Sequence, residues 1–391
     1  MTTIWTPGDV SASQTLADND HLYPGHINEI RSAVNTLEDA PTVDYPSDFA
    51  RQLLVNGNFD IWQRQVTFTN LTTGNYWADK HKLAFDIGAG TLPTITITRQ
   101  ELAANDLWGS NYYTRFAFSG AGSVSNASYY TFYNTSIIIP KYFQAGTGRY
   151  LTYSFMAKSN IAGKRIGTSL GIFYGWGGAS TSVVGSPFTL TSEWVKYTTI
   201  FALPSLSGVT WADDVHNLII PKVYMAWGSS VASECGATTA ETFGGAGNVE
   251  ITQQQLSFSN GALQFYPRSF QQEYLDCLYY YRKSYQYNEY PGDNTEKNII
   301  EVNGAIGTSG STYHVVNFDH SMRLNSTPSI TIYDNATNLG KVSFRNYAGS
   351  VTSNITAGVD NVTPKGFRIG ATGSAADHHS MMFHYVANAD V

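Results

Sequence analysis

The sequence predicts an all-β fold: a jelly-roll β-sandwich, then one helix, then a smaller C-terminal β-sandwich, with a short N-terminal arm and helix in front. Only 14% of the residues are charged, against a usual share of about 25%, while 14% are aromatic and 35 are glycine. This composition is typical of β-rich chains with many tight turns. Short alternating apolar runs, separated by turn residues, occupy most of the chain. The length of 391 residues suffices for roughly two to three domains, and two cysteines, Cys235 and Cys277, cannot make a disulfide framework.

Residues 1–50 are expected to attach the protein to a partner, through an extended arm, a helix and a linker. In the helical stretch HINEIRSAVNTLE, apolar residues recur at spacings of three, four and three, as in a two-heptad coiled-coil seam. The seam residues are Ile27, Ile30, Val34 and Leu37. A helix of about 14 residues is marginal alone in water, so it must pack on something. Isoleucine in the seam favours a three-stranded coiled coil; docking on the chain's own globular part or on another protein are the alternatives.

The pattern of residues 51–268 predicts an antiparallel jelly roll. Five runs have strand character: TITITRQ (94–100), TRFAFSG (114–120), RYLTYSFMAKS (149–159), EWVKYTTIFALP (193–204) and NLIIPKVYMAW (217–227). In the third run, one face carries Leu151, Tyr153, Phe155 and Ala157. Because side chains alternate across a strand, this apolar face is expected to be core.

A connecting helix is predicted within residues 269–290, followed by a second β domain at 291–391. Apolar and aromatic residues recur at helical spacing from Tyr274 to Tyr285, and Ser269 with Gln272 forms a candidate capping box. The helix is therefore expected over about 269–284. Beyond it, further alternating runs predict six or seven strands and a smaller β-sandwich.

The stretch LLVNGNFDIWQRQ, residues 53–65, is interpreted as scaffold and not as an active-site loop. Asn56-Gly57 suits a turn that needs positive φ. Phe59, Ile61 and Trp62 can supply one buried face. Arg64 and Asp79 are expected to pair and to pin the first strand. Neither has a nucleophile or a base as a sequence neighbour, which favours a scaffold role over a catalytic one.

No catalytic constellation, metal site or cofactor site is predicted. GTSLG fits the spacing of a hydrolase elbow at Ser169, but a strand and a glycine loop follow it where a helix is required. Asp213 and Asp214 are adjacent and would point to opposite faces of a strand. GGAGN at 244–248 is expected to be a loop, because no helix pattern follows to cradle a phosphate. The protein is therefore expected not to be an enzyme.

Three histidines near the C-terminus, His378, His379 and His384, are candidate metal ligands. On an extended strand His378 and His384 stand about 20 Å apart, too far for one coordination sphere. A metal on a three-fold axis, bound by one histidine from each of three chains, is the alternative to polar histidines on a sheet face.

Aromatic residues in Gly-, Asn- and Ser-rich surroundings are the candidate glycan-binding residues. They are Trp108, Tyr112, Tyr113 and Trp176. Exposed aromatic faces beside amide groups suit stacking against sugar rings, whereas positions in the core or in an interface are the alternative for each of them.

Charge and hydropathy exclude two classes of partner. The net charge of −7 and the absence of a Lys/Arg cluster in the sequence argue against nucleic acid. The longest apolar runs, such as IIIP, are far shorter than the roughly 20 residues that span a bilayer, and the N-terminus lacks a signal-peptide pattern. Synthesis in a cytoplasm without membrane insertion is expected.

Three stretches together resemble a family of bacteriophage virion proteins, mostly tail-associated or tail-fibre-like, whose jelly roll is similar to carbohydrate-binding modules. The first is LLVNGNFDIWQRQ followed by YWADKHKL at 76–83. The second is LQFYPRSFQQEYLDCLYYYRKSY at 263–285, and the third is VNFDHSMRLNSTPSITIY at 316–333. The resemblance covers roughly residues 52–335.

This resemblance implies a structural protein exposed on the surface of a phage particle. The expected assembly is a homotrimer, a tail fibre or receptor-binding protein, whose N-terminus binds other virion proteins and whose β domains contact host surface glycan. One alternative is a head fibre, collar or capsid decoration protein that binds its virion neighbours. A second is a glycan-cleaving tail spike, which requires convergent carboxylates.

Overall fold

The computed structural model describes residues 51–136, 138, 140, 148–175, 178–212, 217–303, 311–324, 326–372 and 378–390. All of them belong to one compact unit, Asp48–Val391. The predicted attachment segment 1–50, with its seam residues Ile27, Ile30, Val34 and Leu37, lies outside the described residues. Trp176, Asp213 and Asp214 also lie outside them.

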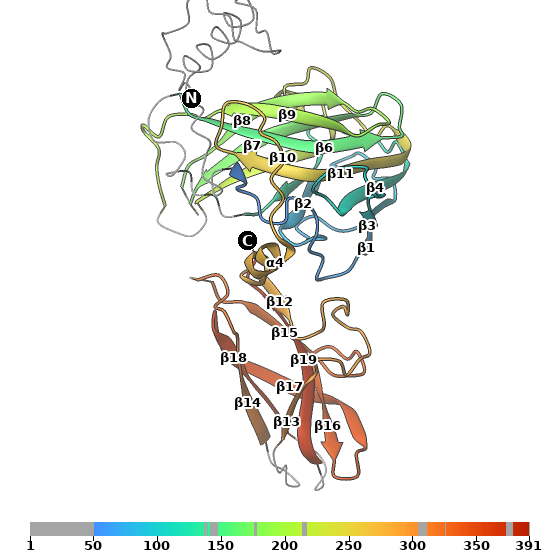
Figure 1. Cartoon of the computed structure of the whole chain (residues 1–391), viewed down its shortest axis with the longest axis vertical. Helices are drawn as coiled ribbons and strands as arrows, with labels where there is room; N and C mark the ends of the chain where they lie inside the picture. The colour runs from blue at the N-terminus through green and yellow to red at the C-terminus, as the bar shows by residue number, and fades with distance from the viewer. Residues whose placement is uncertain are drawn as a thin grey trace, which may run out of the picture. The chain divides into compact units, whose positions relative to one another are not determined.

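The fold class is confirmed: the structure is all-β, and its first domain is a jelly roll of two antiparallel sheets (Figure 1). The six-stranded sheet contains, in spatial order, β1 (Thr67–Thr69), β3 (Ile95–Glu101), β4 (Tyr112–Gly120), β11 (Gly245–Ser257), β6 (Tyr150–Ser159) and β9 (Val195–Ala202). The five-stranded sheet contains β2 (His81–Asp86), β5 (Tyr129–Asn134), β10 (Asn217–Trp227), β7 (Arg165–Tyr174) and β8 (Ser180–Thr189). The five strands expected from the sequence are β3, β4, β6, β9 and β10.

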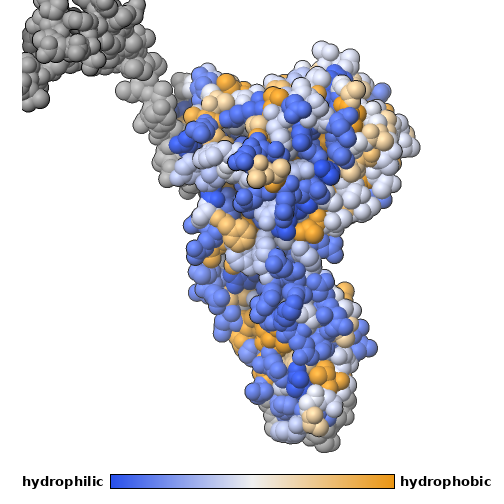
Figure 2. Space-filling model, turned by 45° about the vertical axis from the view of Figure 1, so that its right-hand side comes forward, coloured by the Kyte–Doolittle hydropathy of each residue, from blue (hydrophilic) through white to orange (hydrophobic). Residues whose placement is uncertain are grey.

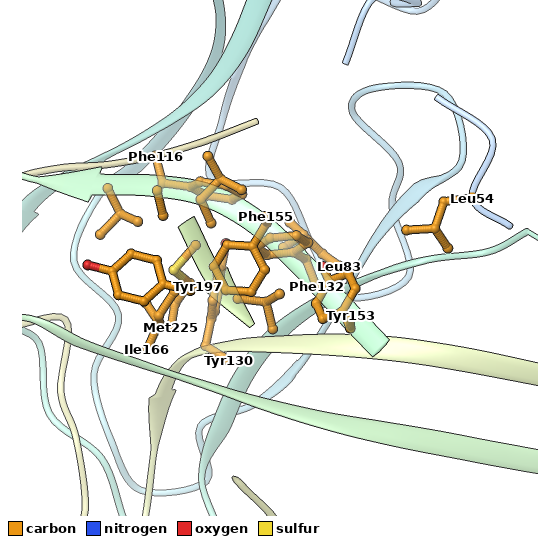
Figure 3. Packing of buried hydrophobic residues seen from close by; sticks show 14 of the residues in the cluster. Leu54, Leu83, Phe116, Tyr130, Phe132, Tyr153, Phe155, Ile166, Tyr197 and Met225 are labelled. Carbon is orange, nitrogen blue, oxygen red and sulfur yellow. The ribbon is translucent and has the colours of Figure 1, made fainter. Parts of the chain in front are cut away.

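The core of the jelly roll lies between the two sheets (Figure 3). The predicted face of β6 is confirmed, since Leu151, Tyr153, Phe155 and Ala157 are all buried. Across the core, the rings of Phe116 from β4 and Phe132 from β5 stack with centroids 5.2 Å apart. Each such ring contributes on the order of 2 kcal/mol by leaving water, so this layer dominates the stability of the domain.

The prediction that GGAGN forms a loop is wrong, because Gly245 to Asn248 begin β11. Gly245 and Gly247 have φ angles of 145° and 150°, and a Cβ on Gly247 would lie 2.6 Å from Ile161. Glycine is disfavoured in strands, but β4 pairs with Gly245 to Asn248 and supplies backbone hydrogen-bond partners here. Tertiary pairing therefore overrides the local preference.

The connecting helix exists but is shorter than predicted: α4 runs over Phe270–Leu278. Ser269 caps it, its hydroxyl accepting a hydrogen bond from the Gln272 backbone N–H at 3.2 Å. In a full capping box the Gln272 side chain would also accept a hydrogen bond from the Ser269 backbone N–H. The described helix lacks this second bond, and Gln272 Nε2 donates to Asp276 Oδ1 at 2.8 Å. After the helix, β12 (Tyr281–Lys283) pairs with β19, whose edge supplies the hydrogen-bond partners that end the helical path.

The C-terminal domain contains the predicted number of strands and has its own core. After residue 299 the strands are β13 (Ile300–Asn303), β14 (Ser311–Asn317), β15 (Ser329–Tyr333), β16 (Lys341–Asn346), β17 (Val351–Thr363), β18 (Gly366–Thr372) and β19 (His378–Asn388). With β12 they form one hydrogen-bonded set of eight strands. The set folds back on itself, so that Phe367 of β18 packs against Tyr385 of β19 with ring centroids 5.3 Å apart. The long Thr-rich strand β17 was not predicted from the sequence.

One face of the described residues is mixed in polarity. Figure 2 shows hydrophilic and hydrophobic residues interspersed over the face that it presents. Among the described residues, no helix is long and apolar enough to cross a membrane.

Candidate functional site

The stretch around Asn56 is a buried scaffold, as its sequence suggests. Asn56 has a φ of 58°, and its Oδ1 accepts a hydrogen bond from the Ile61 backbone N–H at 2.9 Å. Its Nδ2 donates to the backbone oxygens of Ile61 and Asp79, both at 2.8 Å. A Cβ on Gly57 would lie 2.2 Å from the backbone oxygen of Gln254, so only glycine fits this close approach.

Arg64 and Asp79 form the predicted ion pair, and the structure adds two partners to it. The Nη1 of Arg64 lies 3.0 Å from Asp79 Oδ1, and its Nη2 donates to Asp390. Lys80 Nζ lies 3.6 Å from Asp390 Oδ1 and 3.1 Å from the centroid of the Tyr280 ring. We call Arg64, Asp79, Lys80 and Asp390 the buried ion cluster. The separation of more than three hundred residues between Asp390 and Arg64 left no local signal for it in the sequence.

Burial shifts the pKa values of groups in and next to the buried ion cluster, and it also keeps these groups out of reach of a ligand. Burial raises the pKa of Asp79 and lowers the pKa of Lys80 to about 8. Burial also lowers the pKa of His81 to about 3, so its ring is neutral and lies 3.0 Å from the Asn56 backbone oxygen. These side chains are at most 13% exposed. The cluster therefore stabilises the packing of residues 61–81 against the last residues of the described chain.

The other polar candidates from the sequence are also held by internal contacts. Ser169 lies inside β7, with its Oγ 3.2 Å from the hydroxyl of Tyr224. The Nδ1 of His384 lies 3.0 Å from Ser284 Oγ, and its Nε2 lies 3.0 Å from the Thr295 backbone oxygen. Over the part of the chain that the structure describes, no group of three His, Cys, Asp or Glu side chains is placed to hold a metal ion.

The structure separates the four predicted glycan-binding residues. Trp108 is 68% exposed in the connection between β3 and β4, and Tyr112 is half-buried with the Arg99 guanidinium 4.6 Å above its ring. Tyr113 is 8% exposed, because Arg115 and Trp194 cover it, and it offers no open ring face. Tyr112 and Tyr113 are neighbours on one strand and point to opposite faces.

The connection that carries Trp108 also lines a polar pocket of about 380 Å³, which we call the Trp108 pocket after this loop, although Trp108 itself is not one of its lining residues. The pocket is lined by Glu101, Leu102, Ala103, Ala104, Asn105, Leu107, Ser110, Asn111 and Tyr112. Glu101 is the one carboxylate among these described lining residues. Carboxylate, amide and hydroxyl groups on the same loop as an exposed indole can hydrogen-bond a sugar while the apolar face of the sugar stacks on the indole.

The backbone around Trp108 is fixed although its indole is exposed. The Trp108 backbone oxygen accepts a hydrogen bond from Gln253 Nε2 at 2.8 Å, and the next backbone oxygen, of Gly109, accepts from Asn58 Nδ2 at 3.1 Å. Gln253 has a φ of 52° at the irregularity in β11, and its Nε2 also donates to Ser110 Oγ at 2.9 Å. A residue with a positive φ persists where surrounding contacts hold it in place. Here Gln253 is such a residue, and its hydrogen bonds hold the loop that presents Trp108.

Comparisons with known proteins give distant structural likenesses. No protein-family model and no curated protein matches this sequence. The enzymatically active domain of tailspike protein 4 from bacteriophage CBA120 is 14% identical with a TM-score of 0.28, and the match covers 46% of this chain but 19% of that one. A putative sugar binding protein from Bacteroides thetaiotaomicron is 13% identical with a TM-score of 0.29, covering 53% of this chain and 100% of that one.

A family 11 carbohydrate-binding module from Clostridium thermocellum is also similar, at 12% identity and a TM-score of 0.26. That match covers 51% of this chain and 99% of the module. At TM-scores this low, the likenesses carry no argument about this chain. The assignment of a jelly roll rests on the observed strand order and the two-layer core.

Proposed function

We propose that this chain is a non-enzymatic structural protein of a bacteriophage particle that binds host surface glycan through the Trp108 pocket. The observation that carries the proposal is the Trp108 indole, which is 68% exposed. The backbone carbonyls of Trp108 and Gly109 nevertheless accept hydrogen bonds from buried side chains of the jelly roll. A large aromatic ring held open to water on a fixed loop is costly to leave uncovered, and a sugar ring covers it well.

The viral context is supported by the three sequence stretches that resemble phage virion proteins. In this context the chain is a homotrimeric tail fibre or receptor-binding protein, attached to virion neighbours through residues 1–50. Three copies would present three Trp108 pockets, and binding several glycans at once compensates for weak single sites. A head fibre, collar or decoration protein is the second candidate. Labelling purified particles with an antibody separates the two, since it places the protein on the tail or on the head.

Binding without cleavage is supported by the composition of the pocket. Glycoside hydrolysis uses two carboxylates that flank one bond, whereas the described lining of the Trp108 pocket contains Glu101 alone. Incubation of the full chain with a bound polysaccharide should leave the length of the polymer unchanged. Shortening of the polymer would favour the tail-spike reading.

Replacing Trp108 with alanine should weaken glycan binding about tenfold, because one stacked aromatic contact contributes on the order of 1.4 kcal/mol. The measurement is binding of the full chain to a glycan array, followed by titration of the best ligand. Tyr347→Ala is the matched control, since Tyr347 is an aromatic residue that is 76% exposed in the C-terminal domain. Equal affinity of Trp108→Ala and the unmodified chain would remove the pocket from the proposal.

A further inference from the structure

A second surface for a ligand lies on the C-terminal domain, on the outer face of β14, β18 and β17. The register of these strands aligns Tyr313 with Gly370 and Gly370 with Gly358 in one row across the sheet. The next row on the same face contains Val315, Arg368 and Asp360. The intervening residues of β18, Phe367, Ile369 and Ala371, face the core.

Two glycines side by side in the middle of a sheet leave its backbone uncovered. The Tyr313 ring covers one of them, since a Cβ on Gly370 would lie 2.6 Å from its edge atoms. Aromatic cover of a strand glycine explains that contact on structural grounds alone. It does not explain Gly358, where a Cβ would meet nothing within 4 Å. A glycine in a strand interior often marks a place where a ligand approaches the backbone closely.

The uncovered row forms the floor of a pocket of about 580 Å³, which we call the glycine trough. It is lined by Ser311, Tyr313, Ile355, Thr356, Ala357, Gly358, Val359, Asp360, Gly370, Ala371 and Thr372. Tyr313 is 61% exposed although it covers Gly370, so much of its ring surface is open to solvent beside the trough.

The polar groups at the two ends of the trough are held in place and balanced in charge. Arg368 donates two hydrogen bonds to Asp360, at 2.7 and 2.6 Å, and its guanidinium lies 5.1 Å from the centroid of the Tyr313 ring. At the other end the hydroxyls of Ser311 and Thr372 are 2.9 Å apart. The guanidinium thus compensates the negative charge of Asp360. The Asp360 carboxylate can accept hydrogen bonds from a neutral polar ligand, and the two hydroxyls can accept or donate them.

We propose that the glycine trough binds a neutral hexopyranose unit of a glycan. The apolar C–H face of the sugar packs on the exposed part of the Tyr313 ring, and its hydroxyl groups bond Asp360 at one end and Ser311 and Thr372 at the other. The missing side chain at Gly358 lets the ring approach the sheet. This site is separate from the Trp108 pocket, so one chain would hold two sugar units on two β domains.

The test fills the trough without disturbing the sheet. Gly358→Val places a branched side chain in open space on a regular strand, where valine is favoured over glycine, so its midpoint of thermal unfolding should not fall. Gly120→Val is the matched control, because Gly120 also lies in a strand of the described chain with nothing within 4 Å of an added Cβ. Tyr313→Ala serves as a second variant that removes the stacking face.

Binding is measured by saturation-transfer NMR on the full chain carrying Trp108→Ala, which weakens the other proposed site. The probes are the methyl glycosides of glucose, galactose and mannose, with the glycoside of glucuronic acid as the charged comparison. We expect transfer to at least one neutral glycoside, little to the glucuronide, loss of transfer in Gly358→Val and in Tyr313→Ala, and retention in Gly120→Val.

Two results would overturn the proposal. One is the absence of transfer from the Trp108→Ala chain when the unmodified chain shows it, which leaves the Trp108 pocket as the sugar site. The other is transfer that survives in Gly358→Val. If Trp108→Ala leaves saturation transfer unchanged and Gly358→Val abolishes it, the glycine trough is supported as the sugar site and the Trp108 pocket is excluded.

Discussion

Replacing Arg64 with methionine should lower the free energy of unfolding by about 3–5 kcal/mol, the usual cost of leaving buried charges without their partner. Arg64 contacts two carboxylates, Asp79 and Asp390, whose side chains are 2% and 4% exposed. Without the guanidinium, Asp390 keeps the ion pair with Lys80 at 3.6 Å, and Asp79 loses its ion pair. Urea unfolding of the full chain, followed by tryptophan fluorescence, measures the loss.

Arg345→Met is the matched control for this experiment. Arg345 also bridges two carboxylates, Glu296 and Glu301, at 3.0 and 3.1 Å, but their side chains are 49% and 36% exposed. Exposed ion pairs contribute roughly 0–1 kcal/mol, so this variant should unfold close to the unmodified chain. Similar losses for both arginines would show that the buried ion cluster is not placed as described.

Replacing Glu273 with glutamine should stabilise the protein by about 2–3 kcal/mol at pH 8 and should have little effect at pH 4. Glu273 is buried on α4, and its Oε2 accepts a hydrogen bond from the Asn56 backbone N–H at 2.6 Å. Burial raises the pKa of Glu273 from 4.5 to about 7. The folded protein therefore favours the protonated carboxyl, and glutamine reproduces that neutral form.

The direction of this effect follows from the raised pKa of Glu273. Its contribution to stability is fully present below the pKa of the unfolded chain and is lost as the pH rises through about 7. The free energy of unfolding of the two proteins, measured from pH 4 to pH 8, should therefore diverge as the pH increases. Glu193→Gln, at an exposed position, provides the control. A Glu273→Gln variant that loses stability at pH 8 would mean that the charged form is the one the fold prefers.

The hydrogen bonds around Asn56 explain why an apparent loop motif is scaffold. Its side chain fixes the turn and bonds the backbone of Asp79, while its own backbone N–H bonds Glu273 of α4. The neighbouring Trp62 backbone N–H bonds the hydroxyl of Tyr287 at 3.2 Å. Residues from three separated parts of the chain thus meet at this turn, which leaves no open surface for a substrate.

Local patterns in the sequence determined the secondary structure and several close contacts. Alternation placed Leu151, Tyr153 and Phe155 on the core face of β6, because successive side chains of a strand must point to opposite sides. The Ser269 cap and the positive φ of Asn56 follow from short-range backbone chemistry in the same way. The pairing of Arg64 with Asp79 also involves residues close in sequence.

The tertiary structure decided what depends on partners far away in the chain. The helix ends at Leu278 because the edge of β19 pairs with β12, and GGAGN enters a strand because β4 pairs with Gly245 to Asn248. The same holds for the place of Asp390 beside Arg64 and for the row of Tyr313, Gly370 and Gly358. Strand register and buried charge partners are set by the packing of distant segments, and no local pattern of residues encodes them.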